Sequence, residues 1–206
     1  TERPAGVQYT LDSWVKHLVD FIDALGLDKV NLVGNSYGGA LSLATAIRHS
    51  GRVNRMVLMG AAGVKFPLTE GLDYAWGYTP SIENMRKMLD LFAYDRNLVS
   101  DELARLRYEA SLREGVQEAY ASMFPAPRQR SIDALASPEE DIAKIQSPAL
   151  IIHGREDRIL PFSNSVRLFE LLPNSQLHMF GKCGHWTQIE HSARFNKLVL
   201  DFFGED

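Results

Sequence analysis

Apolar residues recur along the chain with two different spacings, and the segments that they define follow one another in a regular order. Helical spacing over residues 12–25 predicts an amphipathic helix with Asp12 or Ser13 as its N-cap and Gly26 at its end. Short runs rich in apolar residues predict buried strands at 29–34, 52–60, 148–154 and 176–181. Further helical patterns lie at 39–50, 164–172 and 192–203. Strands that alternate with helices indicate a mostly parallel sheet covered on both faces, so we predict an α/β fold.

This alternation stops between the second and third predicted strands. Residues 67–134 contain no convincing strand pattern; helical patterns occupy 81–93, 100–113 and 115–124. A helical insertion in an α/β fold suggests a lid over one end of the sheet. We therefore predict a first core part at 1–66, a helical lid at 67–134 and a second core part at 135–206.

Composition narrows the classes of partner. With 206 residues, 45% of them hydrophobic, the chain can bury a substantial core, and its formal net charge of −4 argues against nucleic acid as a partner. No apolar run approaches the roughly 18 residues of a membrane span, and no signal peptide pattern is present. The single cysteine, Cys183, excludes an internal disulfide and suits a reducing compartment. We expect a cytoplasmic protein with no membrane partner.

The sequence Gly34-Asn35-Ser36-Tyr37-Gly38 matches the G-x-S-x-G nucleophile elbow. In that turn the serine takes a strained conformation between a strand and a helix, and glycines allow the neighbouring backbone to pass close by. A plain turn serine is the alternative, but the predicted strand and helix flank Ser36 as the elbow requires. The backbone amide of Tyr37, at the start of the helix, could bind an oxyanion.

A serine nucleophile needs a base and an acid that orients the base, in the chain order Ser, Asp or Glu, His. Asp157 follows the third predicted strand in "ALIIHGREDRILP", and His185 follows the fourth in "QLHMFGKCGHW". Glu156 is the alternative acid, and His191 is the alternative base. His153, at the end of a strand, is expected to be a packed histidine.

A metal site is the competing interpretation of the cluster formed by Cys183, His185 and His191. Their spacing matches no zinc pattern, and a second pair of cysteines is missing. We predict no metal and no cofactor, with Cys183 packed rather than reactive.

Four segments carry a resemblance to a known family: "GNSYGGAL", "HGREDRILP", "GKCGHWTQIEH" and "LFAYDRNLVSDELARLRYEA". Together they resemble the meta-cleavage-product hydrolases of the α/β-hydrolase superfamily, above all those that act on 2-hydroxymuconate semialdehyde. The resemblance runs along essentially the whole chain. It implies an α/β-hydrolase fold and hydrolysis of a carbon–carbon bond in 2-hydroxymuconate semialdehyde or a 6-alkyl analogue. The products would be 2-hydroxypenta-2,4-dienoate and formate or a small carboxylic acid.

The resemblance also implies roles for individual residues. Ser36, Asp157 and His185 fall on the catalytic triad of the family. Asn35, Arg107 and Trp186 fall on positions near the substrate, where the rigid donor fork of an arginine suits a carboxylate or enolate oxygen. A solvated helix-face arginine and a packed tryptophan are the alternatives for the last two.

The family pattern is incomplete at the N-terminus. Members carry preceding strands and a loop that supplies the second oxyanion donor, and no such loop precedes Ser36. Without them the Tyr37 amide is the one donor left, and residues 29–34 form an open apolar edge. We therefore expect the chain to be the C-terminal part of a longer polypeptide.

Two other functions remain open at this stage. A carboxylesterase could use the same triad, and a non-catalytic module or fragment could keep the fold; a dehalogenase would need an aspartate in place of Ser36. The expected partner is a small dienoate, and the expected assembly is a homo-oligomer.

Overall fold

The computed structural model describes residues 6–205. The strands are β1 (Val30–Asn35), β2 (Val53–Met59), β3 (Ala149–Gly154) and β4 (Ser175–Phe180). The longer helices are α1 (Leu11–Ala24), α2 (Tyr37–Arg48), α4 (Ile82–Phe92), α5 (Asp101–Ser111), α6 (Val116–Met123), α9 (Ser163–Leu171) and α11 (Ser192–Phe203). All of these elements lie within two residues of the predicted bounds, and the predicted α/β fold is confirmed.

Several short elements were not predicted. They are α3 (Glu70–Trp76), α7 (Gln129–Leu135), α8 (Glu139–Ile142), α10 (Thr187–Glu190) and two 3₁₀ turns, η1 (Ser50–Arg52) and η2 (Arg96–Leu98). Elements of one or two turns are too short to show a helical period. The predicted N-cap of α1 was also wrong: Thr10 caps it, because Thr10 Oγ1 accepts from the Ser13 amide and Ser13 Oγ accepts from the Thr10 amide.

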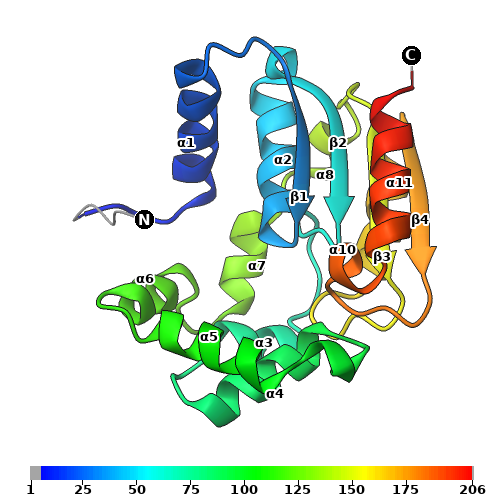
Figure 1. Ribbon diagram of the computed structural model, residues 1–206. Helices are drawn as coiled ribbons and strands as arrows, with labels where there is room; N and C mark the ends of the chain where they lie inside the picture. Colours follow the sequence, from blue (N-terminus) through cyan, green and yellow to red (C-terminus); the bar gives the residue numbers. More distant parts are fainter. Residues whose placement is uncertain (1–5, 206) are drawn as a thin grey trace.

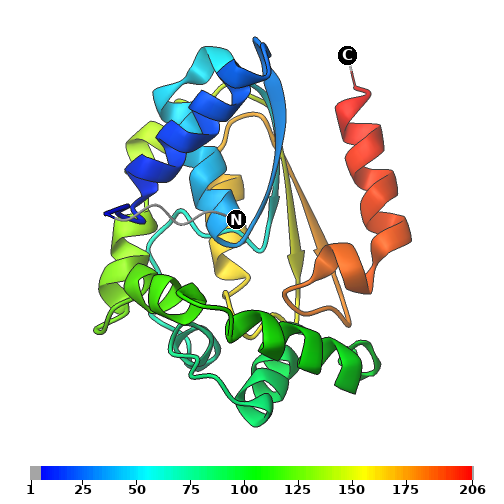
Figure 2. The same cartoon turned by 60° about the vertical axis from the view of Figure 1, so that its left-hand side comes forward.

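The four strands form a parallel sheet in the order β1-β2-β3-β4. Successive residues of β2 point to opposite faces, and both faces are buried. Met56 and Leu58 pack under α2, α8 and α9, whereas Val57 and Met59 pack under α11. Figure 2 shows the result as three layers, with α1 and α2 on one side of the sheet and α11 on the other.

Strand β1 is one edge of this sheet among the described residues, and Val33 on it is 50% exposed. An exposed apolar side chain on an edge strand agrees with the open edge expected at residues 29–34. The expectation of additional strands before this segment stays a prediction.

Helices α3 to α6 lie across the carboxyl ends of the strands, at the bottom of Figure 1. Met85, Leu89 and Ala104 of these helices are buried in one hydrophobic cluster, separate from the sheet core, and Trp186 belongs to the same cluster. In contrast, Ile132 and Leu135 of α7 belong to a cluster with α1 and α2. The predicted boundaries at 67 and 134, and the lid role of the segment, stay predictions. In parallel α/β sheets, ligands bind at the carboxyl ends of the strands.

Candidate active site

Ser36 sits in a strained turn between β1 and α2. Its φ of 55° and ψ of −114° are unusual for a residue with a side chain. The Ser36 amide donates to the Met59 carbonyl at 2.9 Å. Its own carbonyl accepts from the amides of Gly39 and Ala62 at 2.9 and 3.1 Å. These backbone bonds hold the conformation that lifts the hydroxyl away from the sheet.

Close packing around this turn depends on Gly34 and Gly39. A Cβ at Gly34 would lie 2.2 Å from the Gly38 carbonyl oxygen, and one at Gly39 would lie 2.3 Å from Ala61 Cβ. Within residues 6–205, and apart from its chain neighbours and the backbone of α2, no atom lies within 4 Å of a Cβ built on Gly38. We expected Gly38, the last glycine of the motif, to be required for close packing. The residue that close packing requires is Gly39, the next in the chain.

Two neighbours of Ser36 were predicted to act with it. Tyr37 begins α2, so its amide has no carbonyl partner inside the helix and lies at the positive end of the helix dipole. Burial raises the pKa of the Tyr37 phenol to about 12. Asn35, whose predicted place near the substrate stays a prediction, donates from Nδ2 to the Met59 carbonyl at 3.0 Å. Its side chain thus ties β1 to β2 beside the turn.

Asp157 and His185 form a buried pair on the loops after β3 and β4. Asp157 Oδ2 lies 2.7 Å from His185 Nδ1, and both side chains are 1% exposed. Asp157 Oδ1 accepts from the amides of Ile159 and Leu160 at 2.7 and 3.0 Å. Burial alone would raise the pKa of Asp157, but the imidazoles of His185 and His153 lower it well below its ordinary value. The carboxylate is therefore ionised and can hold the Nδ1 proton of His185.

The alternative acid and the alternative base lie elsewhere. Glu156 accepts from the Cys183 amide at 3.0 Å and from Arg155, so it joins the acid loop to the histidine loop. The His191 ring stacks on Phe180 at 4.6 Å, and its Nε2 lies 3.4 Å from the Lys182 carbonyl. The structure thus brings Asp157 and His185 together, as the preferred pair requires.

Two glycines allow this approach, and the sequence analysis did not single them out. Gly60 follows β2 with a φ of 43°, and a Cβ there would lie 3.1 Å from both Asp157 Oδ2 and His185 Nδ1. Gly154 ends β3, where a Cβ would lie 2.0 Å from the Gly184 carbonyl. A glycine directly after a strand is the sequence signal that could have revealed Gly60.

His153 is more than a packed histidine. It is fully buried; its Nδ1 lies 2.7 Å from Ser165 Oγ, and its Nε2 lies 3.2 Å from the Leu160 carbonyl and 3.4 Å from Asp157 Oδ2. An Nε2 proton facing these acceptors leaves Nδ1 to accept from Ser165. His153 therefore approaches Asp157 Oδ2, the same oxygen that His185 Nδ1 contacts.

The remaining nitrogen of His185, Nε2, is buried and has no hydrogen-bond partner among the described residues. Ser36 lies beside a cavity of about 20 Å³ whose other walls are almost entirely apolar. The lining residues are Ser36, Tyr37, Ala62, Phe66, Leu72, Trp76, Ile132, Leu135 and Leu160. A strained serine, a free imidazole nitrogen and an oriented carboxylate are the parts of a serine hydrolase site.

Comparisons with known proteins agree with this geometry. A family model for the alpha/beta hydrolase fold matches residues 1–192. The 2-hydroxy-6-oxo-2,4-heptadienoate hydrolase of Pseudomonas putida is 62% identical over 206 residues, which cover 100% of this chain and 75% of that protein. A 2-hydroxymuconate semialdehyde hydrolase of Pseudomonas putida is 58% identical over 205 residues, 100% of this chain and 73% of that protein.

A solved structure gives the same result. It is a serine-to-alanine mutant of the meta-cleavage product hydrolase CumD from Pseudomonas fluorescens, complexed with acetates. It matches with a TM-score of 0.97 and 62% identity, over 98% of this chain and 74% of that one. The chain belongs to the meta-cleavage-product hydrolases of the α/β-hydrolase fold. The resemblance seen in the sequence is confirmed.

In this hydrolase, α5 carries Arg107 to the histidine loop. The Arg107 guanidinium lies 5.1 Å from the centre of the Trp186 ring, and that ring stacks on Phe92 at 5.3 Å. Trp186 is 7% exposed, whereas Arg107 is exposed. The structure therefore places Arg107 and Trp186, two of the three residues predicted to bind substrate, against each other; their substrate-binding role stays a prediction.

The other candidates for chemistry in the hydrolase are less suited to it. Burial, with the carboxylates of Glu190, Asp157 and Glu156 nearby, raises the pKa of Cys183 to about 12, so this thiol stays protonated. Over residues 6–205 no three histidine, cysteine or acidic side chains gather as a metal would require. In the same range no helix has the length and apolar content needed to cross a membrane.

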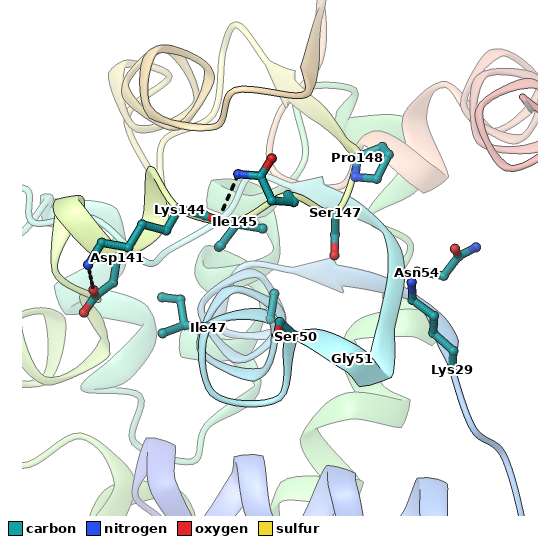
Figure 3. Close-up of a pocket in the computed structure, with 12 residues that line it drawn as sticks. Lys29, Ile47, Ser50, Gly51, Asn54, Asp141, Lys144, Ile145, Ser147 and Pro148 are labelled. Carbon is teal, nitrogen blue, oxygen red and sulfur yellow. Dashed lines mark hydrogen bonds and ion pairs between the residues drawn. The ribbon is translucent and has the colours of Figure 1, made fainter.

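Residues at the amino ends of the strands line a larger cavity, of about 620 Å³ (Figure 3). Ser36 is not among its lining residues. Lys29 and Pro148 line it just before β1 and β3. Lys144 pairs with Asp141 across its wall at 2.9 Å. None of the candidate residues lines this cavity, so we do not assign it to the active site although it is the larger of the two.

Proposed function

We propose that this protein hydrolyses the C5–C6 bond of 2-hydroxymuconate semialdehyde or its 6-methyl analogue. The products are 2-hydroxypenta-2,4-dienoate and formate or acetate. The observation that carries the proposal is the buried Asp157–His185 pair, together with the strained turn at Ser36, in a chain 58–62% identical to hydrolases named for these substrates.

Ser36 is the nucleophile in this proposal, and His185 is its base. The dienol first takes the keto form, with a proton on C5. His185 Nε2 accepts the Ser36 proton as Oγ attacks C6, and Asp157 stabilises the resulting imidazolium. The tetrahedral oxyanion faces the Tyr37 amide at the start of α2. The C5–C6 bond then breaks as the oxyanion collapses to the acyl ester, and the electron pair of the bond moves through the conjugated chain onto the C2 oxygen. The dienolate takes the proton from the His185 imidazolium and leaves as 2-hydroxypenta-2,4-dienoate.

The acyl group stays on Ser36 until water removes it. His185, neutral again, accepts a proton from a water molecule that attacks the ester carbon, and Ser36 leaves with that proton. The sum of the steps consumes one water and releases one carboxylic acid.

The cavity beside Ser36 supports a small substituent on the ketone carbon. About 20 Å³ corresponds to little more than one water-sized group. Its walls of Ala62, Ile132 and Leu160 are apolar, so a hydrogen or a methyl group suits them better than a charged group.

Arg107 and Trp186 bind the other end of the substrate in this proposal. A guanidinium can donate two parallel hydrogen bonds to the dienoate carboxylate or to the enolate oxygen. The Trp186 ring keeps Arg107 close to the histidine loop. The helical segment thereby acts as a lid that brings a cation to an anionic substrate.

The assembly and location belong to the same proposal. A homo-oligomer would cover exposed apolar residues such as Leu106, 64% exposed, and Leu200, 71% exposed.

A cytoplasmic enzyme would meet the products of aromatic ring fission. Light scattering would show the oligomeric state, and cell fractionation the location.

The decisive experiment follows the visible absorbance of the dienolate after addition to wild type and to Ser36→Ala. We expect turnover by wild type and a loss of at least about 10⁴-fold in the variant. Hydrolysis of a nitrophenyl ester without turnover of the dienoate would instead indicate a carboxylesterase and contradict the proposal.

A further inference from the structure

One carboxylate joins the helical segment to the histidine loop. Glu190 ends α10, and its Oε1 accepts from the Gly184 amide at 2.7 Å. Its Oε2 accepts from the amides of Tyr94 and Asp95 at 2.8 and 2.9 Å. The two oxygens therefore hold the residue before His185 and the two residues that follow the C-cap of α4.

A second contact joins the same two segments. The His185 amide donates to the Phe92 carbonyl at 2.7 Å, and the Phe92 ring lies 5.4 Å from the imidazole. A Cβ on Gly184 would lie 2.5 Å from the Phe92 carbonyl oxygen and 2.9 Å from the Tyr94 nitrogen. The backbone of Gly184 and His185 thus packs directly on the end of α4.

The acid loop is held at the same place. The Arg158 guanidinium donates to the carbonyls of Asp90 and Ala93, the latter at 3.1 Å. Arg158 follows Asp157 directly. The end of α4 therefore contacts both loops that carry the Asp157–His185 pair.

We propose that Glu190 is a positioning residue that fixes His185 through the end of α4. Both of its oxygens must accept, because the three backbone amides and the Cys183 thiol that face them are all donors. Glutamine has the same shape but offers one acceptor and one NH₂ donor. At position 190 it would turn a donor toward either Gly184 or the Tyr94 and Asp95 amides, so one connection would be lost.

The first test is Glu190→Gln, with Glu139→Gln as the matched control. Glu139 also accepts two hydrogen bonds, but from Arg167 on a distant surface. We expect kcat of Glu190→Gln to fall about 10- to 100-fold, as a misplaced base would cause, with KM changed by less than about threefold. The control should keep both constants.

A spectroscopic measurement separates positioning from general loss of stability. The proton between His185 Nδ1 and Asp157 should give a downfield NMR resonance, which Glu190→Gln should shift or broaden while circular dichroism stays unchanged. An unchanged resonance, or kcat within about twofold of wild type, would overturn the proposal.

A second pair of variants tests the lid side without changing Glu190. Asp95 has a φ of −80°, which proline can adopt, and Asp95→Pro removes the amide that Glu190 accepts. Asp95→Ala keeps that amide and loses the same side chain. We expect Asp95→Pro to lower kcat more than Asp95→Ala, and its effect to be less than additive with Glu190→Gln. Fully additive effects would contradict a shared connection.

The kinetic arm uses the reaction proposed above, so the two proposals need separate readouts. If wild type fails to convert the dienoate, the proposed function fails. Acylation of Ser36 by p-nitrophenyl acetate and the His185 resonance then still test Glu190. An equal rate of acylation in wild type and Glu190→Gln would overturn its positioning role.

Discussion

The two sides of the candidate active site are held in different ways. On the sheet side, Asp157 and His185 are buried and bonded to each other; two backbone amides donate to Asp157, and the His185 amide donates to the Phe92 carbonyl. On the helical side, Arg107 is exposed, and it contacts the sheet side through the Trp186 ring. The sheet side is therefore preorganised for proton transfer, whereas the helical side can adjust to a substrate. Changes to Asp157, His185 and the groups that hold them, the end of α4 included, should act mainly on kcat, and changes to Arg107 mainly on KM.

The largest effect is expected from Asp157→Asn. The amide cannot hold the Nδ1 proton of His185 in the required tautomer, so we expect kcat to fall about 10⁴-fold. The matched control is Glu156→Gln. Glu156 is the neighbouring carboxylate on the same loop, but it bonds to Arg155 and the Cys183 amide and not to the His185 imidazole. Steady-state kinetics that show equal losses in the two variants would contradict the assignment of the acid.

The same variant tests the charge of Asp157 through pH. The folded protein lowers the pKa of this carboxyl below its ordinary value, so its ionisation stabilises the fold. That contribution is present above the unfolded pKa of about 3.9 and is lost as pH falls toward the folded value. The Tm advantage of wild type over Asp157→Asn should therefore shrink between about pH 7 and pH 3. A constant difference would contradict this account.

Gly60→Ala should give the next largest effect. The new methyl group would lie 3.1 Å from Asp157 Oδ2 and from His185 Nδ1, at a φ of 43°. We expect kcat to fall about 10- to 100-fold and the free energy of unfolding to fall by about 1–2 kcal/mol. Gly51→Ala is the control, because a Cβ there meets open space. Kinetics and urea unfolding measure both effects; a normal kcat would show that the pair tolerates movement.

Arg107→Lys tests the helical side. Lysine keeps the charge but loses the planar fork, so we expect KM to rise about tenfold, or ~1.4 kcal/mol, with a smaller change in kcat. Arg105→Lys, on the same helix, is the control. If kcat falls and KM stays constant, Arg107 belongs with the preorganised side, and the contrast drawn above is wrong.

The smallest effect on activity is expected from Ser165→Ala. His153 Nδ1 would lose its donor in a fully buried position. We expect the free energy of unfolding to fall by about 1–2 kcal/mol, with kcat within about threefold of wild type. Ser163→Ala, on the exposed start of α9, should be neutral. Calorimetry and kinetics measure the two quantities, and a large loss of kcat would give His153 a direct part in the reaction.

The fold and the reactive residues could be predicted because both depend on local order along the chain. The sequence pattern of residues 29–50 predicts a strand followed by a turn and a helix, and Asp157 and His185 each follow a strand. Parallel neighbours then bring these loops together at one edge of the sheet.

The rest of the site depends on contacts between distant segments. Arg107 and Trp186 were reached through family resemblance alone, because nothing in the local pattern joins α5 to the histidine loop. His153 was correctly predicted to be packed, but its contact with Asp157 and the role of Glu190 were missed for the same physical reason: the partners lie on other elements or across a turn. Short helices such as α7 and α10 were missed because they are shorter than the period that reveals a helix.

The most direct test of the central claim is to detect the acyl group on Ser36. Rapid quenching of wild type during turnover of 2-hydroxymuconate semialdehyde, followed by digestion and mass spectrometry, should find a formyl group on the peptide that carries Ser36. The 6-methyl analogue should leave an acetyl group on the same peptide. Full turnover with no adduct on Ser36, or an adduct on another residue, would contradict the account.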